Sequence, residues 1–166
     1  MTSRLLVDKI EGKTSSSAVQ MPEGVPIQYK RSSTQAALGT VTSTSYVQLG
    51  SGSLEVTITP KFSTSKLVIH ACCMVYINNN AYPSTRFAFY RDGTIIDQHN
   101  NTYASGYVQV NTGQLGGFIP YISAEVDANN TNSTTFTIYT KSNSSGNNSI
   151  FDDLCNRWIS VEEIAQ

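Results

Sequence analysis

The sequence predicts an all-β protein, an antiparallel β-sandwich. Three observations favour this class. Apolar and polar residues alternate with a period of two from about Val41 onward, polar loops such as GSGS and SNSSGNNS separate the alternating stretches, and no helical pattern of useful length is present. We expect roughly eight to ten strands, because each alternating stretch is short.

The chain divides into two parts by composition. Residues 1–24 read as an extended segment in which a short alternating stretch, LLVDKI, is followed by a serine tract and a Met-Pro-Glu-Gly turn. Residues 25–166 form the predicted β-sandwich head, which is long enough to bury a core without disulfides or metals. The segment 1–24 has no apolar run typical of a signal peptide.

Two stretches predict half-buried strands with clear directions. In LEVTIT, Leu54, Val56 and Ile58 share one face, and Pro60 ends the strand. In TFTIYTK, Phe136 and Ile138 point inward in the same way. Between them, RFAFYRDGTII predicts a hairpin, since Phe87 and Phe89 share a face and the Asp-Gly pair that follows suits a tight turn. The short STQAAL stretch has room for one helical turn at most.

The stretch Lys66–Tyr76 differs because both of its faces are apolar. One face can cover the core of the head. The other must be covered by a second sheet or by another copy of the chain. Gly116–Val126 shows a similar two-sided character through Ile119 and Tyr121, which favours a large oligomer interface. The side chains expected at this subunit interface are Val68, His70, Cys72, Met74 and Tyr76.

Composition argues against several classes of protein. Charged residues make up 14% of the chain and the net charge is -1, so a grip on nucleic-acid phosphates is not expected. No apolar run is long enough for a transmembrane helix, and we expect no membrane insertion. The three cysteines, Cys72, Cys73 and Cys155, are a poor disulfide framework, and we interpret them as buried reduced thiols from a cytoplasmic site of synthesis.

Both ends of the chain resemble one family. The segments LLVDKIEGKTSSSAVQMPEGVPIQ and WISVEEIAQ, together with TSTSYVQLGSGSLEVTITPKFSTSKLVI between them, resemble tail-fibre-like virion proteins of marine cyanobacterial tailed phages. The region from Asn78 to Phe151 matches only in character, with FYRDGT as its best point. The resemblance implies a jelly-roll-like head that assembles as a homotrimer, and a structural role in the virion. It does not choose between a short fibre, a capsid decoration protein and a fibre tip.

Candidate catalytic and metal-binding residues are few. His70 and Cys72 share a strand face, but no second pair of zinc ligands stands at a fitting distance. Asp97 and His99 share a strand face, where the aspartate could orient the imidazole for acid–base catalysis. No nucleophile motif accompanies them, since GxSxG and HExxH are absent. Asp127–Asn132 carries alternating oxygen side chains but lacks the glycine and the distal glutamate of a calcium loop. We therefore expect no catalytic residues, no cofactor and no metal.

The loops of the head carry a second kind of candidate site. Tyr82, Tyr103 and Tyr107 lie among asparagines and serines, a mixture that suits contact with a host glycan or protein receptor.

Three functions follow, in order of preference. The first is a non-enzymatic virion subunit, a short fibre or a capsid- or tail-attached decoration protein that forms an oligomer, with the homotrimer expected. The second is a host-recognition tip domain, and the third is a polysaccharide-cleaving enzyme. In the N-terminal stretch Leu5 and Val7 share a face while Ile10 leaves that register. We expect these three residues to attach the chain to another subunit or to another virion protein.

Overall fold

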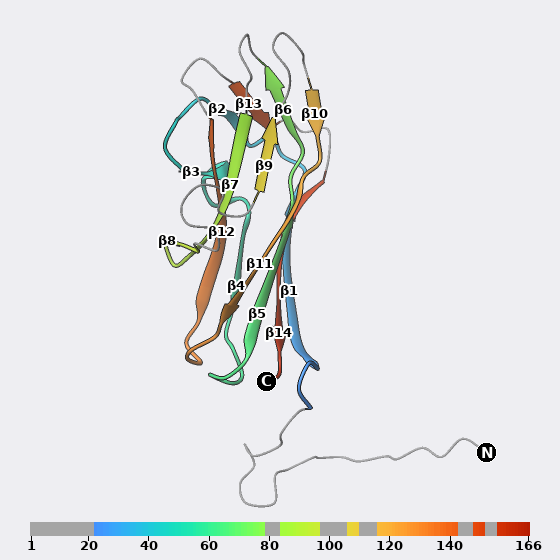
Figure 1. The fold of residues 1–166 in the computed structure, drawn as a ribbon, viewed down its shortest axis with the longest axis vertical. Helices are drawn as coiled ribbons and strands as arrows, with labels where there is room; N and C mark the ends of the chain where they lie inside the picture. Colours follow the sequence, from blue (N-terminus) through green and yellow to red (C-terminus); the bar gives the residue numbers. More distant parts are fainter. Residues whose placement is uncertain (1–21, 79–83, 97–105, 110–115, 143–147, 152–155) are drawn as a thin grey trace, which may run out of the picture.

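Two layers of antiparallel β-strands pack face to face around one core, which confirms the predicted all-β sandwich (Figure 1). The structure, a computed structural model, describes residues 22–78, 84–96, 106–109, 116–142, 148–151 and 156–166. These residues form fourteen strands and one short 3-10 helix, η1 (Leu49–Gly52). The expected number of strands was too low, because several long strands are interrupted midway.

The first layer consists of two four-stranded sheets that follow one another end to end. Their strand orders are β1-β14-β5-β11 and β2-β13-β6-β10. Strands at the same position in the two orders follow one another in the chain, as β1 and β2 do. The first sheet contains β1 (Pro26–Thr34), β14 (Arg157–Ile164), β5 (Lys66–Cys72) and β11 (Tyr121–Asp127). The second contains β2 (Gly39–Val41), β13 (Asn148–Phe151), β6 (Val75–Asn78) and β10 (Gly116–Phe118).

A break between these two sheets corrects one prediction. The stretch Lys66–Tyr76, expected as one strand, is divided at Cys73 and Met74 into β5 and β6. The facing strand is divided at Ile119 and Pro120, and proline has no N–H to donate to the ladder. The N–H of Cys73 reaches the carbonyl of Pro120 at 3.4 Å, so a single long hydrogen bond spans the break there.

The second layer is one sheet built on β12 and β7. These two strands pair over seven residues, from Phe136–Arg91 to Ser142–Thr85. Shorter strands extend both sides of the pair. The members of this sheet are β3 (Val47–Gln48), β4 (Glu55–Ile58), β7 (Ser84–Arg91), β8 (Thr94–Ile95), β9 (Gly106–Gln109) and β12 (Thr134–Ser142).

The core follows the predicted alternation. Leu54, Val56 and Ile58 are buried from the second layer, as are Phe136 and Ile138. The first layer contributes the inward face of β5, and the rings of β7 lie between the layers. Burial of this many large apolar side chains is the main favourable term in folding such a domain. The core side chains from these two strands include Leu67, Ile69, Ala71, Phe87 and Phe89.

The predicted hairpin turn is confirmed at Asp92 and Gly93. Both residues have positive φ, 49° and 80°, and glycine adopts this conformation without strain. The Asp92 carboxylate accepts hydrogen bonds from the Thr134 hydroxyl at 2.6 Å and from the Thr135 N–H at 2.8 Å. These bonds hold Asp92 in a positive-φ backbone conformation that residues other than glycine rarely adopt. By contrast, STQAAL forms no helical turn.

The two ends of the sandwich differ in what they carry. At one end lie the start of β1 and the end of β14, where the N–H of Gly24 donates to the carbonyl of Ala165 at 2.9 Å (Figure 1). At the other end lie the strand ends that border residues 79–83, 110–115 and 143–147 (Figure 1). These strand ends are Asn78, Ser84, Gln109, Gly116, Ser142 and Asn148, and the pairings among their strands place them together.

Candidate interaction surface

The outward face of the sheet β1-β14-β5-β11, called the outer face below, is an in-register grid. Residues directly opposite one another in neighbouring strands share a face of a sheet. One row therefore contains Ser33, Trp158, Cys72 and Tyr121. The next rows contain Arg31, Ser160, His70 and Ser123, and then Tyr29, Glu162, Val68 and Glu125.

Aromatic rings and a guanidinium form a connected group in the upper rows of the outer face. The Tyr121 ring stacks on His70 with centroids 5.5 Å apart, and its hydroxyl lies 2.7 Å from His70 Nδ1. The Tyr121 and Trp158 rings meet edge to face with their centroids 6.0 Å apart, and the Arg31 guanidinium lies 4.8 Å from the Trp158 ring centroid. These contacts fix the rings in place on rigid strands, so the group is preorganised for contact with a partner.

Exposure singles out the same face. Among the described residues, the large apolar side chains that remain exposed are Tyr29 (56%), Tyr121 (60%) and Ile119 (60%). Tyr29 and Tyr121 lie on the outer face, and Ile119 lies two residues before Tyr121. Exposed apolar side chains that gather on one face mark an interaction site more reliably than the same residues scattered singly.

The second layer also carries tyrosines on its outward face, but they cover one another. Tyr90 and Tyr139 stack with centroids 3.7 Å apart, and Tyr46 meets Tyr90 at 6.3 Å. Lys141 Nζ lies 4.5 Å from the Tyr46 ring centroid. Burial, together with the neighbouring Tyr139, raises the pKa of Tyr90. The three rings of this cluster are half-buried against one another, whereas Tyr29 and Tyr121 remain more than half exposed.

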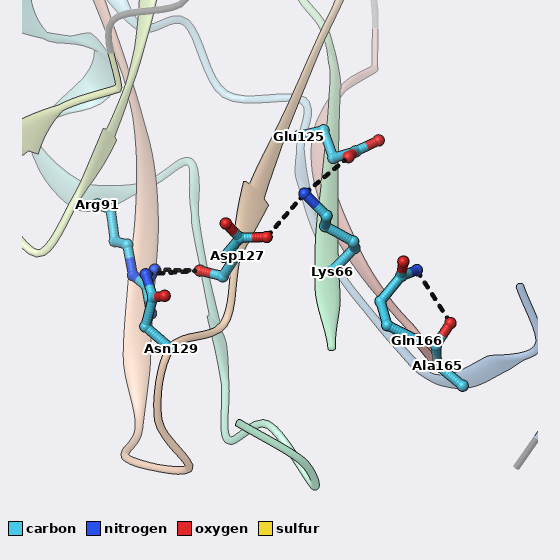
Figure 2. Close-up of polar contacts among 7 residues, drawn as sticks. All are labelled: Lys66, Arg91, Glu125, Asp127, Asn129, Ala165 and Gln166. Carbon is cyan, nitrogen blue, oxygen red and sulfur yellow. Dashed lines mark hydrogen bonds and ion pairs between the residues drawn. The ribbon is translucent and has the colours of Figure 1, made fainter. Parts of the chain in front are cut away.

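Charged side chains occupy the lower end of the outer face. Lys66 Nζ lies 2.7 Å from Asp127 and 3.4 Å from Glu125 (Figure 2). The hydrogen bond with Asp127 is the main reason that the pKa of Lys66 is raised. All three side chains are near water, so this cluster contributes little to stability. It does give the face both signs of charge.

The five predicted interface residues are not all in one sheet. Val68, His70 and Cys72 lie on the outer face, where each is half-buried. Met74 lies in the break, and Tyr76 belongs to β6 in the neighbouring sheet, where both are also half-buried. Their inward neighbours are buried, so within one chain the first face of the stretch is fully covered and the second only in part.

Sequence reasoning missed Tyr29, Arg31 and Trp158, which come from strands far apart in the chain. Each is unremarkable in its own strand, and only the order β1-β14-β5 brings them together. Local alternation indicates the face of a residue but not the neighbouring strand. No signal in a single sequence would have identified this group.

Other candidates have structural roles or lie outside the described residues. Asp127–Asn132 forms the β11–β12 turn, in which Asn130 Oδ1 accepts from the Asn132 N–H at 2.8 Å. Within the described ranges, no three His, Cys, Asp or Glu side chains are grouped to hold a metal ion. Tyr107 is placed in β9 opposite Arg86. The remaining candidates, Leu5, Val7, Ile10, Tyr82, Asp97, His99, Tyr103 and Cys155, lie outside the described residues.

The two adjacent glutamates of β14 have separate environments. Glu162 is half-buried on the outer face, and Glu163 is fully buried beneath the sheet. Burial alone would raise the pKa of Glu163, but hydrogen bonds from the Lys61 N–H, the Gln28 amide and the Phe62 N–H outweigh it, so the pKa is lowered. Glu163 is thus ionised at neutral pH, where it serves as a buried acceptor of structural hydrogen bonds and is not poised as a general acid.

Arg157 is the largest fully buried side chain among the described residues. Its Nη1 donates to the carbonyl of Ala36 at 3.1 Å, close to the break in the first layer. This bond joins the start of β14 to the chain that follows β1. The guanidinium thus satisfies one backbone carbonyl where the regular ladder stops, while its Nε and Nη2 are buried with no hydrogen-bond partner among the described residues.

None of the helical segments in the described ranges has the length and apolarity to cross a bilayer.

Comparison with known proteins adds no family. No protein-family model and no curated protein matches the chain.

Proposed function

We propose that the protein is a non-enzymatic structural subunit of a tailed-phage virion, a short fibre or a capsid- or tail-attached decoration protein. It assembles as an oligomer, with a homotrimer expected, and the outer face is the subunit interface. The observation that carries this proposal is the outer face itself, with Tyr29 and Tyr121 exposed beside the Trp158–Arg31 pair. Aromatic and arginine side chains of this kind dominate the energetics of protein interfaces.

The arrangement of the strands supports the rest of the proposal. The strands β1, β4, β5, β7, β11, β12 and β14 alternate between the two layers along the chain, and this alternation supports the proposed jelly-roll-like head. The described chain begins at one end of the sandwich, and the strand ends that border residues 79–83, 110–115 and 143–147 lie at the other (Figure 1). A subunit attached through its N-terminal segment would therefore present those strand ends away from the particle.

Two measurements test this proposal. Light scattering coupled to size-exclusion chromatography gives the mass of the assembly, and three copies are expected at micromolar concentration. Imaging of virions that carry a tagged chain locates the subunit, with density expected on the capsid, the tail or a fibre. A stable monomer would contradict the interface, and purified virions without the chain would contradict the structural role.

Host recognition is the second candidate, and one observation favours it. The strand ends that border residues 79–83 lie at the end opposite Gly24, which suits contact with a host surface by Tyr82 and its neighbours (Figure 1). A glycan array with the intact protein tests this function. Binding that is lost when Tyr82, Tyr103 and Tyr107 are changed to alanine would support it, and an array without binding would remove it for the glycans sampled. Among the residues that the structure describes, no geometry favours the third candidate, a polysaccharide-cleaving enzyme.

A further inference from the structure

A pocket opens along one side of the sandwich, between the two layers. Its volume is about 590 Å³, and it is bordered by β8 of the second layer and by the end of β11 of the first. We call it the seam pocket. Ile95, Ile96 and Val126 supply its apolar lining, and its polar lining consists of Arg91, Asp92, Thr94, Asp127 and Asn129.

Both strands that border the seam pocket are at the edges of their sheets. In the described part of the chain, β11 pairs only with β5, and β8 pairs only with β7. An edge strand presents backbone N–H and C=O groups that an added strand can pair with. Apolar pockets beside such an edge take the alternate side chains of the added strand. The seam pocket therefore suits an extended peptide with apolar residues at every second position.

Arg91 makes this pocket a preformed feature. Its Nη1 and Nη2 donate to the carbonyls of Asp127 and Ala128 at 2.8 and 2.7 Å, and its Nε donates to the Thr134 hydroxyl at 3.0 Å. Figure 2 shows the bond to Asp127, beside the hydrogen bond of Asn129 to the same carbonyl. One side chain thus ties the second layer to the end of β11. A peptide that enters the pocket does not have to order it first.

The N-terminal segment of the chain has the chemistry that this pocket requires. In RLLVDKI, Leu5 and Val7 stand at alternate positions, and the basic residues Arg4 and Lys9 flank the apolar part. Asp92 and Asp127 line the pocket together with Arg91, but the carboxylate of Asp92 is already bound by Thr134 and Thr135 and that of Asp127 by Lys66, so the fit of the segment rests on its apolar side chains. Eleven residues separate Ile10 from Pro22, where the described fold begins, and an extended chain of that length spans up to roughly 40 Å.

The edges of the first layer indicate which copy receives the segment. The described chain enters beside β1, and the seam pocket opens on β11, at the opposite edge of the same sheet. In a ring of subunits that use their outer faces around one axis, the β1 edge of one copy lies next to the β11 edge of the following copy. Such head-to-tail contacts close into a ring when the rotation permits. This step rests on the oligomer of the proposed function.

We propose that residues Leu5–Ile10 of one copy add as a strand to the β11 edge of the neighbouring copy, with the side chain of Val7 in the seam pocket. The segment that leaves one head thereby ties it to the next. The occupant is a second copy of this chain, and the interface is separate from the outer face, although both serve the same assembly.

Photocrosslinking in the full-length protein tests the proposal directly. Val7 is replaced by the photoreactive residue p-benzoylphenylalanine, and this protein is mixed with a nitrogen-15-labelled wild-type chain before irradiation. The expected products join position 7 of the light chain to a heavy peptide that contains Ile95 or Val126. The matched control has the same replacement at Asp8, which faces away from Val7 in an extended strand, and its yield of pocket peptides should be at least tenfold lower. Crosslinks that stay within one chain, or that miss the pocket, overturn the proposal.

A second measurement uses the strength of association. Val7→Asp places a charge in the apolar pocket and should raise the dissociation constant at least tenfold, whereas Asp8→Asn should leave it within a factor of two. Position 7 lies outside the described fold, so a loss of association is not explained by an unfolded head. If Val7→Asp assembles like wild type while Tyr121→Asp does not, this inference is wrong and the outer-face interface stands. A wild-type protein that is monomeric contradicts both.

Discussion

The carboxylate of Glu163 accepts two hydrogen bonds from the backbone N–H of Lys61, at 2.8 and 3.0 Å, although the two residues are 102 positions apart. The Phe62 N–H and the Gln28 amide donate to the same carboxylate at 3.1 and 2.6 Å. One buried side chain on the last strand therefore holds the turn between β4 and β5 and part of β1. The end of the chain closes the sandwich in this way.

The first prediction concerns this carboxylate. Glu163→Gln keeps the shape but removes the charge and places an amide beside N–H donors, so we expect a loss of about 1–3 kcal/mol in the free energy of unfolding at pH 7. Because the pKa of Glu163 is lowered in the folded state, its contribution is complete above the ordinary value of 4.5 and is lost as the pH falls through the lowered pKa.

Chemical denaturation between pH 3 and pH 7 measures both effects. The wild-type protein should lose stability across this acidic range more steeply than Glu163→Gln. Glu55→Gln, at an exposed position of β4, is the matched control and should resemble wild type. Equal pH profiles for wild type and Glu163→Gln would show that the hydrogen bonds do not favour the ionised form.

The second prediction concerns the adjacent thiols. Burial, with a smaller effect from Cys72, raises the pKa of the Cys73 thiol to about 12, so at pH 8 only roughly one thiol in ten thousand is ionised. Cys73 should react with iodoacetamide only after unfolding. Cys72 is half-buried on the outer face and should react faster in a monomeric variant than in the assembled protein.

Peptide mapping by mass spectrometry separates these two sites from Cys155. The comparison of assembled wild type with a dissociated variant is the test of the interface. Equal reactivity of Cys72 in both would place the subunit contact elsewhere. Rapid labelling of Cys73 in the native protein would show that the core opens easily beside the break in the first layer.

The third prediction separates the two outward faces of the sandwich. Tyr121→Asp places a charge among the aromatic rings of the outer face, and we expect the dissociation constant of the assembly to rise roughly thirtyfold, about 2 kcal/mol. Tyr139→Asp changes a tyrosine of the second layer, where the rings already cover one another, and should leave association within a few-fold of wild type.

Sedimentation velocity over a range of concentrations measures both constants, and circular dichroism checks that each variant is folded. If a folded Tyr139→Asp variant dissociates while Tyr121→Asp remains assembled, the subunit interface lies on the second layer and the proposed outer-face interface is wrong.

The fold was largely predictable from the sequence, but the surface was not. Period-two alternation indicated the inward faces of β4, β7 and β12 because burial imposes that pattern on each strand locally. The division of Lys66–Tyr76 was missed, since it depends on Pro120 in a strand that is distant in the chain. The group of Tyr29, Trp158 and Tyr121 depends on strand order, which is a property of the whole topology. The half-buried outward side chains of β5, Val68, His70 and Cys72, were named from the sequence because alternation alone assigns them to that face.

The last prediction concerns residues 1–22. Removal of Met1–Pro22 leaves Gly24 and its hydrogen bond to Ala165, which is where the chain joins the sandwich. The truncated chain should therefore melt within a few degrees of wild type, because none of the buried core residues is lost. It should fail to join the virion, since the stretch Leu5–Ile10 is the expected attachment element. The measurement is the amount of chain in purified particles from a host that supplies the truncated form.

A full-length chain with residues 4–10 permuted is the matched control, because it keeps the length and composition but loses the alternation, and it should also be excluded. Incorporation of the truncated chain at the wild-type level would show that attachment resides in the head.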